Sequence, residues 1–176
     1  MSDSFLDEEA SIAHEQDELD LLDGHALRRL LRDLPELQPV VKVGPNETVR
    51  AAIDGMVDYG VGIVLVVENK KLLGVFSERD VLRKVAGGGL DIDTTLVSDV
   101  MTEKPTTLDT DAELVYALNK MTVGGYRHLP LLKNGEPVAV VSMRDIVEYI
   151  VSLYQDHVLK SGDDPSQAHA QDRERA

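Results

Sequence analysis

The chain contains the same short motif twice, and this internal repeat restricts its fold more than any other feature. Ser-Glu-Arg-Asp at residues 77–80 recurs as Ser-Met-Arg-Asp at residues 142–145, 65 positions later. Each copy follows a short apolar run, and the register holds without a gap between residues 40–85 and residues 105–150. A duplication of this kind predicts a pseudo-two-fold body whose clefts come in related pairs. We therefore expect the function to lie between the two halves.

Composition limits the class of protein. The chain has 176 residues, which suits one compact domain or two small ones packed together. Trp is absent and aromatic residues make up only 4%, so the core has to be built from aliphatic side chains and Met. Cysteine is absent as well, which excludes a disulfide framework, thiolate metal ligation and cysteine catalysis.

The net charge of −14 narrows the choice of partners. A strongly acidic chain is repelled by nucleic-acid phosphates and by acidic lipid headgroups, so we expect neither nucleic acid nor a membrane as a partner. The longest apolar run, residues 61–67, is too short to span a bilayer, and no signal-peptide pattern is visible at the start of the chain. These features predict a soluble, cytoplasmic protein.

The two ends of the chain differ from the repeats. Residues 1–36 form an acidic extension that we expect to be partly helical, because leucines recur at helical spacing between His25 and Leu34 and Pro35 ends the pattern. Its apolar stripe would dock on the repeats or on a second subunit, and a frayed acidic tail is the alternative before Leu19. Residues 159–176 are polar and are expected to be disordered.

Each repeat has the pattern strand, helix, strand, strand, helix, which predicts a mixed α+β fold of two tandem domains, residues 37–97 and 98–158. In the first repeat, Asn46 is the expected N-cap of a helix that Gly60 closes in the left-handed conformation. In the second repeat, Thr110 or Asp111 is the expected N-cap, and the Asn-Gly pair at residues 134–135 is a strong hairpin signal.

The helices are expected to bury their periodic apolar side chains against the sheets. The expected inner faces comprise Val49, Ala52, Ile53, Met56, Val57, Val81, Leu82, Val85, Leu114, Leu118, Met121, Ile146, Val147 and Ile150. Three consecutive glycines at residues 87–89, followed by residues 91–95, predict a flexible link between the two domains.

The Ser-x-x-Asp motif has two interpretations. Ser at the start of a helix with an acid three residues later is a capping box, which needs no ligand. A helix N-terminus at a strand end also suits an anionic phosphate, with the Ser hydroxyl as a further donor, and an Asp one turn later can accept both hydroxyls of a ribose. Ser77 with Asp80, and Ser142 with Asp145, therefore fit a nucleotide, and the presence of two copies favours that interpretation.

The order of elements and the ending Gly-hydrophobic-x-Ser/Thr-x-x-Asp resemble the cystathionine β-synthase (CBS) domain family. Residues 74–80 match this ending at every position, and residues 139–145 differ only in having Ala139 for Gly. Val-Met-Thr at residues 100–102 is similar to the family's lead-in to a second domain, and residues 126–132 resemble its Arg-His-Leu-Pro strand. The resemblance covers about residues 37–154 and implies a stand-alone Bateman module, in which two CBS domains pack through their sheets.

The resemblance also implies a ligand and its contacts. Clefts between paired CBS domains bind adenosine-containing ligands: AMP, ADP, ATP, NAD or S-adenosylmethionine. By position, Ser77 and Ser142 would contact phosphate, while Asp80 and Asp145 would hold ribose hydroxyls. The remaining candidate ligand-binding residues lie in the same turns, near phosphate or in the adenine pocket: Arg79, Arg144, Arg127, His128, Thr106 and Thr107. The resemblance implies no catalytic residue, no metal ligand and no obligatory cofactor.

The two halves differ at one strand. The second repeat has Arg127 and His128 where the first has Gly62 and Ile63, so one cleft should be more polar than the other and the two affinities unequal. From the residues alone, two other roles stay open: a surface salt bridge for Arg127 and a satisfied strand-end histidine for His128.

Three function classes follow from these observations. We expect a regulatory adenine-nucleotide-binding module that forms a homodimer and signals to a separate effector protein. The alternative is a structural or dimerisation module without a ligand. A nucleotide-using enzyme is the weaker alternative, because the chain has no Walker loop, no dinucleotide-binding glycine motif and no metal-spaced His cluster.

Overall fold

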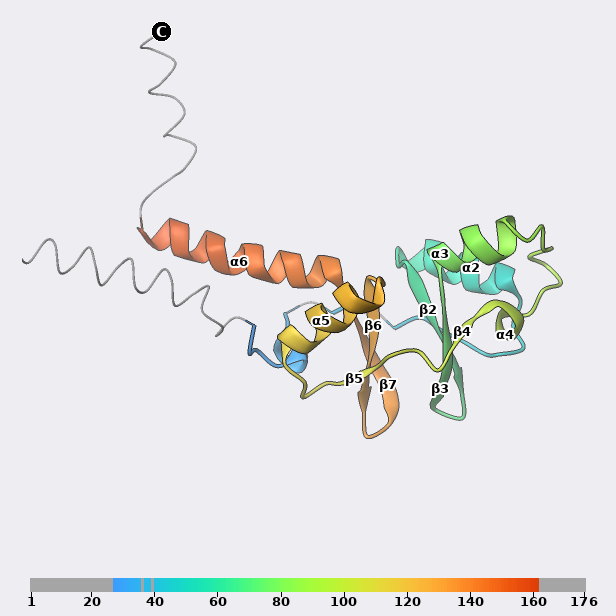
Figure 1. The fold of residues 1–176 in the computed structure, drawn as a ribbon, viewed down its shortest axis with the longest axis horizontal. Helices are drawn as coiled ribbons and strands as arrows, with labels where there is room; N and C mark the ends of the chain where they lie inside the picture. The colour runs from blue at the N-terminus through green and yellow to red at the C-terminus, as the bar shows by residue number, and fades with distance from the viewer. Residues whose placement is uncertain (1–26, 36, 39, 162–176) are drawn as a thin grey trace, which may run out of the picture.

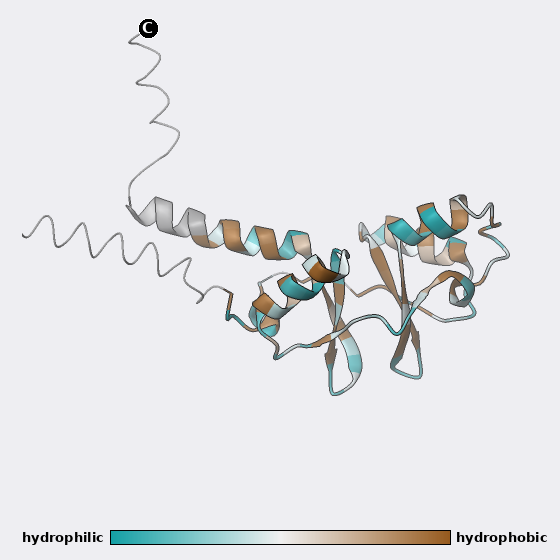
Figure 2. Cartoon of the chain, viewed as in Figure 1, coloured by the Kyte–Doolittle hydropathy of each residue, from teal (hydrophilic) through white to brown (hydrophobic). Residues whose placement is uncertain are grey.

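The fold comes from a computed structural model, which describes residues 27–35, 37–38 and 40–161. Two lobes lie side by side, and each consists of a small sheet with helices packed against it (Figure 1). Strands β2 and β3 are largely hydrophobic, whereas the hairpin tips are hydrophilic (Figure 2). The predicted α+β class with two β-α-β-β-α-like repeats is confirmed.

The first lobe is built around a four-stranded sheet with the order β1-β2-β3-β4. β1 pairs with β2 in parallel, and the other two pairings are antiparallel. The first four residues of β2 are buried, as expected for a continuous apolar strand. The elements are β1 (Lys42–Val43), α2 (Val49–Tyr59), β2 (Ile63–Glu68), β3 (Lys71–Ser77), α3 (Glu78–Asp80), the π-helix η3 (Val81–Ala86), α4 (Val97–Val100) and β4 (Thr102–Glu103).

The second lobe repeats this plan with a three-stranded sheet in the order β5-β6-β7. β5 pairs with β6 in parallel, and β6 pairs with β7 in antiparallel orientation. The helices α2 and α5 end alike, because Gly60 and Gly125 both adopt the left-handed conformation, with φ of 63° and 67°. The elements are β5 (Leu108–Asp109), α5 (Leu114–Gly124), β6 (His128–Lys133), β7 (Glu136–Ser142) and α6 (Met143–Ser161).

The two sheets meet through a small apolar cluster. Ile63, Leu65 and Val140 are its buried members, and β3 lies against β7. Since Ser77 ends β3 and Ser142 ends β7, this contact brings both Ser-x-x-Asp turns to the junction between the lobes.

The segment before the first lobe packs on the second lobe. Leu31, at the start of the 3-10 helix η2 (Leu31–Asp33), is fully buried in the second core. The carbonyl groups of Leu27 and Arg29 accept hydrogen bonds of 2.9 and 2.8 Å from the amides of residues 115 and 114, which begin α5. This segment therefore satisfies free N–H groups that every helix start leaves open.

The link between the lobes satisfies the free N–H groups at the start of α2 in the first lobe. The carbonyl groups of Thr95 and Ile92 each accept a hydrogen bond of 2.9 Å, from the amides of residues 49 and 50 at the start of α2. Arg50 also forms an ion pair with Asp93. The prediction of a flexible link is therefore wrong for residues 91–95, because these backbone bonds hold them against α2.

The predicted helix over residues 25–34 is also wrong where the structure describes it. Residues 27–29 form a turn and residues 31–33 form the 3-10 helix η2. Leu31 N donates to the carbonyl of Ala112 and Arg32 N to that of Thr110, so the backbone pairs with the second lobe rather than with itself. The rest of the predicted N-terminal extension, through residue 26, lies outside the described residues.

Two predicted N-caps are wrong. Thr48 caps α2 in place of Asn46, and its Oγ1 accepts a hydrogen bond of 3.3 Å from Ala51 N. The residue before α5 is Glu113, whose side chain makes no cap bond, so neither Thr110 nor Asp111 has that role. The carbonyl groups of Leu27 and Arg29 accept hydrogen bonds from the first amides of α5 instead. These residues lie far from α5 in the sequence, so no local pattern predicts the contacts.

Four of the side chains predicted to face inward are exposed. The buried stripes are narrower than the apolar patterns: residues 49, 52 and 56 in α2, and residues 146 and 149 in α6. Leu82 faces out because the segment winds as a π-helix, which changes the spacing of its inner face. The exposed side chains and their exposed fractions are Val57 (73%), Leu82 (70%), Val147 (50%) and Ile150 (39%).

The expected disorder of residues 159–176 falls mostly outside the described residues. Helix α6 continues to Ser161, so residues 159–161 are helical rather than disordered.

Candidate functional site

A cavity of about 590 Å³ lies between the two repeats. Its walls combine the turn after β3 with the start of β6 and the segment that leads into β5. Six of the ten predicted ligand-binding residues line it: Ser77, Arg79, Asp80, Thr106, Arg127 and His128. The cavity therefore joins the acidic turn of one repeat to basic and hydroxyl side chains of the other.

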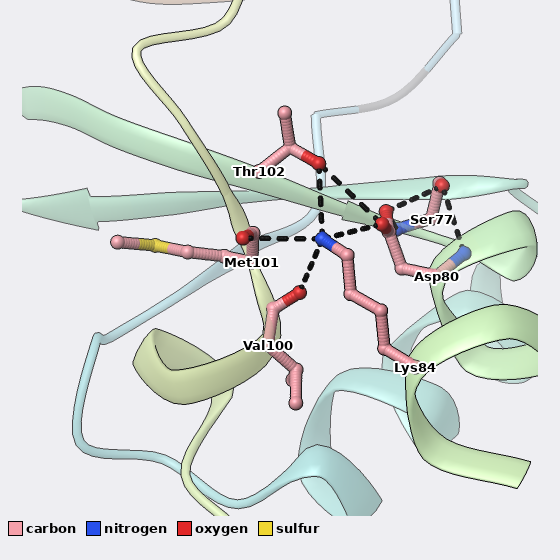
Figure 3. A network of polar contacts seen from close by, with 6 residues as sticks. All are labelled: Ser77, Asp80, Lys84, Val100, Met101 and Thr102. Carbon is pink, nitrogen blue, oxygen red and sulfur yellow. Dashed lines mark hydrogen bonds and ion pairs between the residues drawn. The ribbon is translucent and has the colours of Figure 1, made fainter. Parts of the chain in front are cut away.

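Ser77 and Asp80 line this cavity, and together they form a complete capping box. The Ser77 hydroxyl accepts from Asp80 N at 3.4 Å, and Asp80 Oδ2 accepts from Ser77 N at 3.0 Å and from Ser77 Oγ at 2.7 Å (Figure 3). Local sequence produces this geometry, because Ser at an N-cap and an acid three residues later satisfy each other's backbone.

Lys84 is a site residue that the sequence analysis missed. Its ammonium lies 2.8 Å from Asp80 Oδ1 and donates to the carbonyls of Val100, at 2.8 Å, and Met101, at 3.3 Å (Figure 3). Thr102 completes the network, with its Oγ1 3.3 Å from the ammonium and 3.4 Å from Asp80 Oδ1. The spacing indicates this ion pair, because a cation four residues after an acid lies on the same helical face.

These contacts set the charge state of Asp80. Burial of the carboxyl group acts to raise its pKa, but the hydrogen bonds from Lys84 and Ser77 outweigh burial and lower the pKa below its usual range. Asp80 is therefore an ionised acceptor near neutral pH, the state in which a carboxylate can accept from the two hydroxyls of a ribose.

Basic side chains also line the cavity. Arg79 reaches across the junction and its Nη1 donates to the carbonyl of Gly125, at the end of α5, at 2.6 Å. This places a cation at the negative end of the helix dipole. Lys104 and the exposed Arg127 add two more cations to the cavity wall. The arrangement suits an anionic group such as phosphate.

His128 begins β6 and is half-buried between the lobes. Burial lowers its pKa and so does Arg127, while Glu78 and Asp145 act in the opposite direction. The imidazole is therefore neutral near neutral pH and can both donate and accept a hydrogen bond. Gly62 makes room for it, since a Cβ there would lie 3.0 Å from His128 Cε1.

The other four predicted residues are not among those that line this cavity. Ser142 is only 2% exposed, and Asp145 Oδ2 accepts from its backbone N at 2.7 Å. Arg144 pairs with Glu148 on its own helix, at 2.7 Å, and Thr107 is half-buried just before β5. The two Ser-x-x-Asp turns thus have the same local structure and different surroundings.

The described residues also bear on metal binding and on membrane insertion. Among residues 27–35, 37–38 and 40–161, no three His, Asp or Glu side chains come together as metal ligands. In the same described part of the chain, no helix has the length and hydrophobicity needed to cross a membrane.

Sequence comparison identifies relatives of the two repeats. A CBS domain family model matches residues 31–87 and 97–152. A CBS domain-containing protein of Arabidopsis thaliana is 37% identical over 120 residues, which is 68% of this chain and 22% of the relative's length. An uncharacterised 17.7 kDa protein of Acidianus ambivalens is 32% identical over 117 residues, 65% of this chain and 70% of the relative. The match thus spans a small part of the plant protein and most of the archaeal one.

Solved structures give the same assignment. A CBS-domain containing protein of Agrobacterium tumefaciens superposes with a TM-score of 0.63 and 29% identity, covering 68% of this chain and 98% of that one. A CBS domain protein of Pyrobaculum aerophilum, crystallised with AMP, superposes with a TM-score of 0.60 and 29% identity, covering 70% of this chain and 99% of that one. The chain belongs to the CBS domain family and contains two CBS domains in tandem.

Proposed function

We propose that this chain is a regulatory module that binds an adenine nucleotide, of the AMP, ADP or ATP class, in the cavity beside Asp80. One observation carries the proposal: a single cavity combines an ionised carboxylate and a hydroxyl from one repeat with Arg127, Lys104 and Thr106 of the other. A nucleoside monophosphate requires two recognition elements: an acceptor for the ribose diol, and cations that bind the phosphate.

In this proposal a ribose hydroxyl and a phosphate replace two contacts that the site residues make with one another. The long contact from Thr102 Oγ1 to Asp80, 3.4 Å, is the weakest at that carboxylate and is the one that a ribose hydroxyl replaces. The Ser77 hydroxyl, now 2.7 Å from Asp80 Oδ2, turns to donate to phosphate. Thr106 lies on the adenine side, and Arg79 and Arg127 lie on the phosphate side. NAD and S-adenosylmethionine are further adenosine ligands that this site would accept.

The AMP complex of the Pyrobaculum aerophilum relative supports the ligand class, at 29% identity over 70% of this chain. Regulation, rather than catalysis, is proposed because the carboxylate at the site is already engaged by a cation and a cap, which favours binding over proton transfer. The signal would pass to a separate effector protein as a change in how the two lobes pair. We place the module in the cytosol, although an Arabidopsis relative, 32% identical over 118 residues (64% of this chain and 57% of that one), is named as mitochondrial.

The test is calorimetric titration of the purified protein, freed of copurified nucleotide, with AMP first and with ATP, NAD and S-adenosylmethionine as competitors. The proposal predicts micromolar binding of AMP, and the order of competition names the ligand class. Absence of heat with all four ligands would instead support a structural module whose Ser-x-x-Asp turns are helix caps alone.

We also propose that the chain forms a homodimer through its helices. Large apolar side chains lie exposed on α2, at the end of α5 and on η3: Val57 (73%), Tyr59 (64%), Val123 (80%) and Leu82 (70%). Val57 and Leu82 line the same hollow, and exposed apolar groups that lie together are typical of surfaces that a partner covers. Light scattering at micromolar concentration should give twice the chain mass of 19.3 kDa, and the mass of a monomer would contradict the dimer.

A further inference from the structure

Gln38 occupies in the second lobe the position that Thr102 occupies in the first. Gln38 forms an antiparallel bridge with Val140 of β7, and Thr102 pairs in the same orientation with Val75 of β3. Val140 and Val75 are themselves equivalent positions of the repeat. The two residues thus lie beside the two strands that end in the Ser-x-x-Asp turns.

The contacts of Thr102 and Gln38 differ, and this difference determines whether a ligand can reach the serine of each turn. Thr102 is short and exposed, and it lines the cavity beside Asp80. Gln38 is longer, and its Nε2 donates a hydrogen bond of 3.1 Å to Ser142 Oγ. Ser142 is 2% exposed, whereas its equivalent Ser77 is half-buried and lines the cavity. The long amide therefore covers the Ser142 hydroxyl, whereas Thr102 leaves the Ser77 hydroxyl open to the cavity.

The other end of the amide is not held. Gln38 Oε1 is buried and has no hydrogen-bond partner among the described residues. Buried polar atoms in native proteins are nearly always paired, so the unpaired oxygen costs free energy in the arrangement that covers Ser142, and moving Gln38 out of it removes that cost. Asp145, three residues after Ser142, keeps one carboxylate oxygen outside the cap bond that its Oδ2 makes.

We propose that Gln38 blocks the second cleft, so that each chain takes one adenine nucleotide beside Asp80, and that a latent second site beside Asp145 opens when Gln38 is withdrawn or shortened. The identity of the ligand rests on the proposed function. The shielding of Ser142 by Gln38 does not, and it can be tested without any ligand.

The first experiment uses the absence of cysteine from the chain. A single thiol placed by Ser142→Cys, or by Ser77→Cys as the matched control, reports access through its rate of reaction with a soluble disulfide reagent. The proposal predicts that the thiol at position 142 reacts at least about tenfold more slowly than the one at position 77, because a buried group reacts only when its site opens. Adding Gln38→Thr, which copies Thr102, should remove most of that difference, whereas Gln38→Met, which keeps the length, should not.

The second experiment counts bound AMP by equilibrium dialysis. The wild type should bind one AMP per chain, Gln38→Thr should bind two, and Gln38→Thr with Asp145→Asn should return to one. Equal thiol rates at positions 142 and 77, two AMP bound by the wild type, or a wild type that binds one AMP and gains none with Gln38→Thr would each overturn the blocking role.

The two proposals fail in different ways. If the wild type binds no AMP, the proposed function fails, while slow reaction at position 142 that Gln38→Thr accelerates still supports the blocking role. If the wild type binds one AMP and Gln38→Thr changes neither the thiol rate nor the count, the blocking role fails and the proposed function stands.

Discussion

Lys84 is a single residue at which the two repeats differ in structure and charge. Its equivalent in the second repeat is Tyr149, which is 6% exposed in the second core and has the guanidinium of Arg29 5.4 Å from its ring centroid. Lys84 instead forms an ion pair with Asp80 at 2.8 Å. One substitution between the repeats thus gives the first Ser-x-x-Asp turn a cation and gives the second turn an apolar neighbour.

Replacing Lys84 by Met should destabilise the protein. The stem of the side chain is kept, but Asp80 loses its cation and hydrogen bonds to a charged group of this kind contribute about 1–3 kcal/mol. Because the pKa of Asp80 is lowered in the folded state, its contribution is present above the unfolded pKa and is lost as the pH falls through the folded pKa. Urea denaturation should therefore show a loss of stability near neutral pH that shrinks in acid.

The matched control for this prediction is Arg83→Met, one residue earlier, where the side chain is exposed and forms no ion pair with another described residue. A loss of stability equal to that of the control would show that the Lys84 network contributes nothing.

His128 should make stability depend on pH in a different range. Its pKa is lowered by burial, so the unfolded chain binds this proton at a higher pH than the folded chain does. As the pH falls from about 7 through the unfolded value of about 6.5, the unfolded state holds more protons and the free energy of unfolding decreases. His128→Gln cannot take up this proton, so its stability should change less over that interval. Parallel pH profiles for the two proteins would contradict the burial effect.

The helices show which boundaries a local pattern can predict. The C-caps at Gly60 and Gly125 and the Asn134-Gly135 turn follow from residues that adopt positive φ, and all are present in the structure. The starts of α2 and α5 could not be located in this way. Their free amides are satisfied by carbonyls from residues 92–95 and 27–29, and such contacts depend on how the whole chain packs.

Two substitutions separate the predicted cap from the observed one. Thr48→Ala should lower the free energy of unfolding by about 0.5–2 kcal/mol, because Thr48 Oγ1 accepts from Ala51 N at the start of α2. Asn46→Ala, two residues earlier in the preceding turn, should leave it nearly unchanged. Chemical denaturation measures both, and equal losses would mean that the helix begins where the sequence pattern placed it.

At the scale of the whole molecule, the repeat predicted more of the fold than of the site. The tandem α+β arrangement follows from the 65-residue register, whereas the pairing of the lobes through their sheets was implied by the resemblance to CBS domains. Six of the ten predicted site residues line one cavity, because the repeat brings the end of β3 beside the start of β6. The contact of Gln38 with Ser142, 104 residues away, could not be predicted from spacing. The i, i+4 spacing of Asp80 and Lys84 indicates their ion pair, but it does not reveal the bonds of Lys84 to the carbonyls of Val100 and Met101.

The different surroundings of the two Ser-x-x-Asp turns give a physical reason to expect unequal ligand affinities in the two clefts. The cavity beside Asp80 takes its cations from both repeats, whereas Ser142 is covered by a neutral amide. Pseudo-symmetric halves therefore need not have equivalent functions, even when their central motifs make the same two capping bonds.

The most direct test of the account is a calorimetric comparison of AMP binding by Asp80→Asn and Asp145→Asn with the wild type, after both variants have been shown to be fully folded at the assay temperature. Asp80→Asn should weaken binding at least about tenfold, since a charged acceptor for the ribose is lost, while Asp145→Asn should bind as the wild type does. Full affinity in Asp80→Asn, or a loss confined to Asp145→Asn, would show that the cavity beside Asp80 is not the nucleotide site.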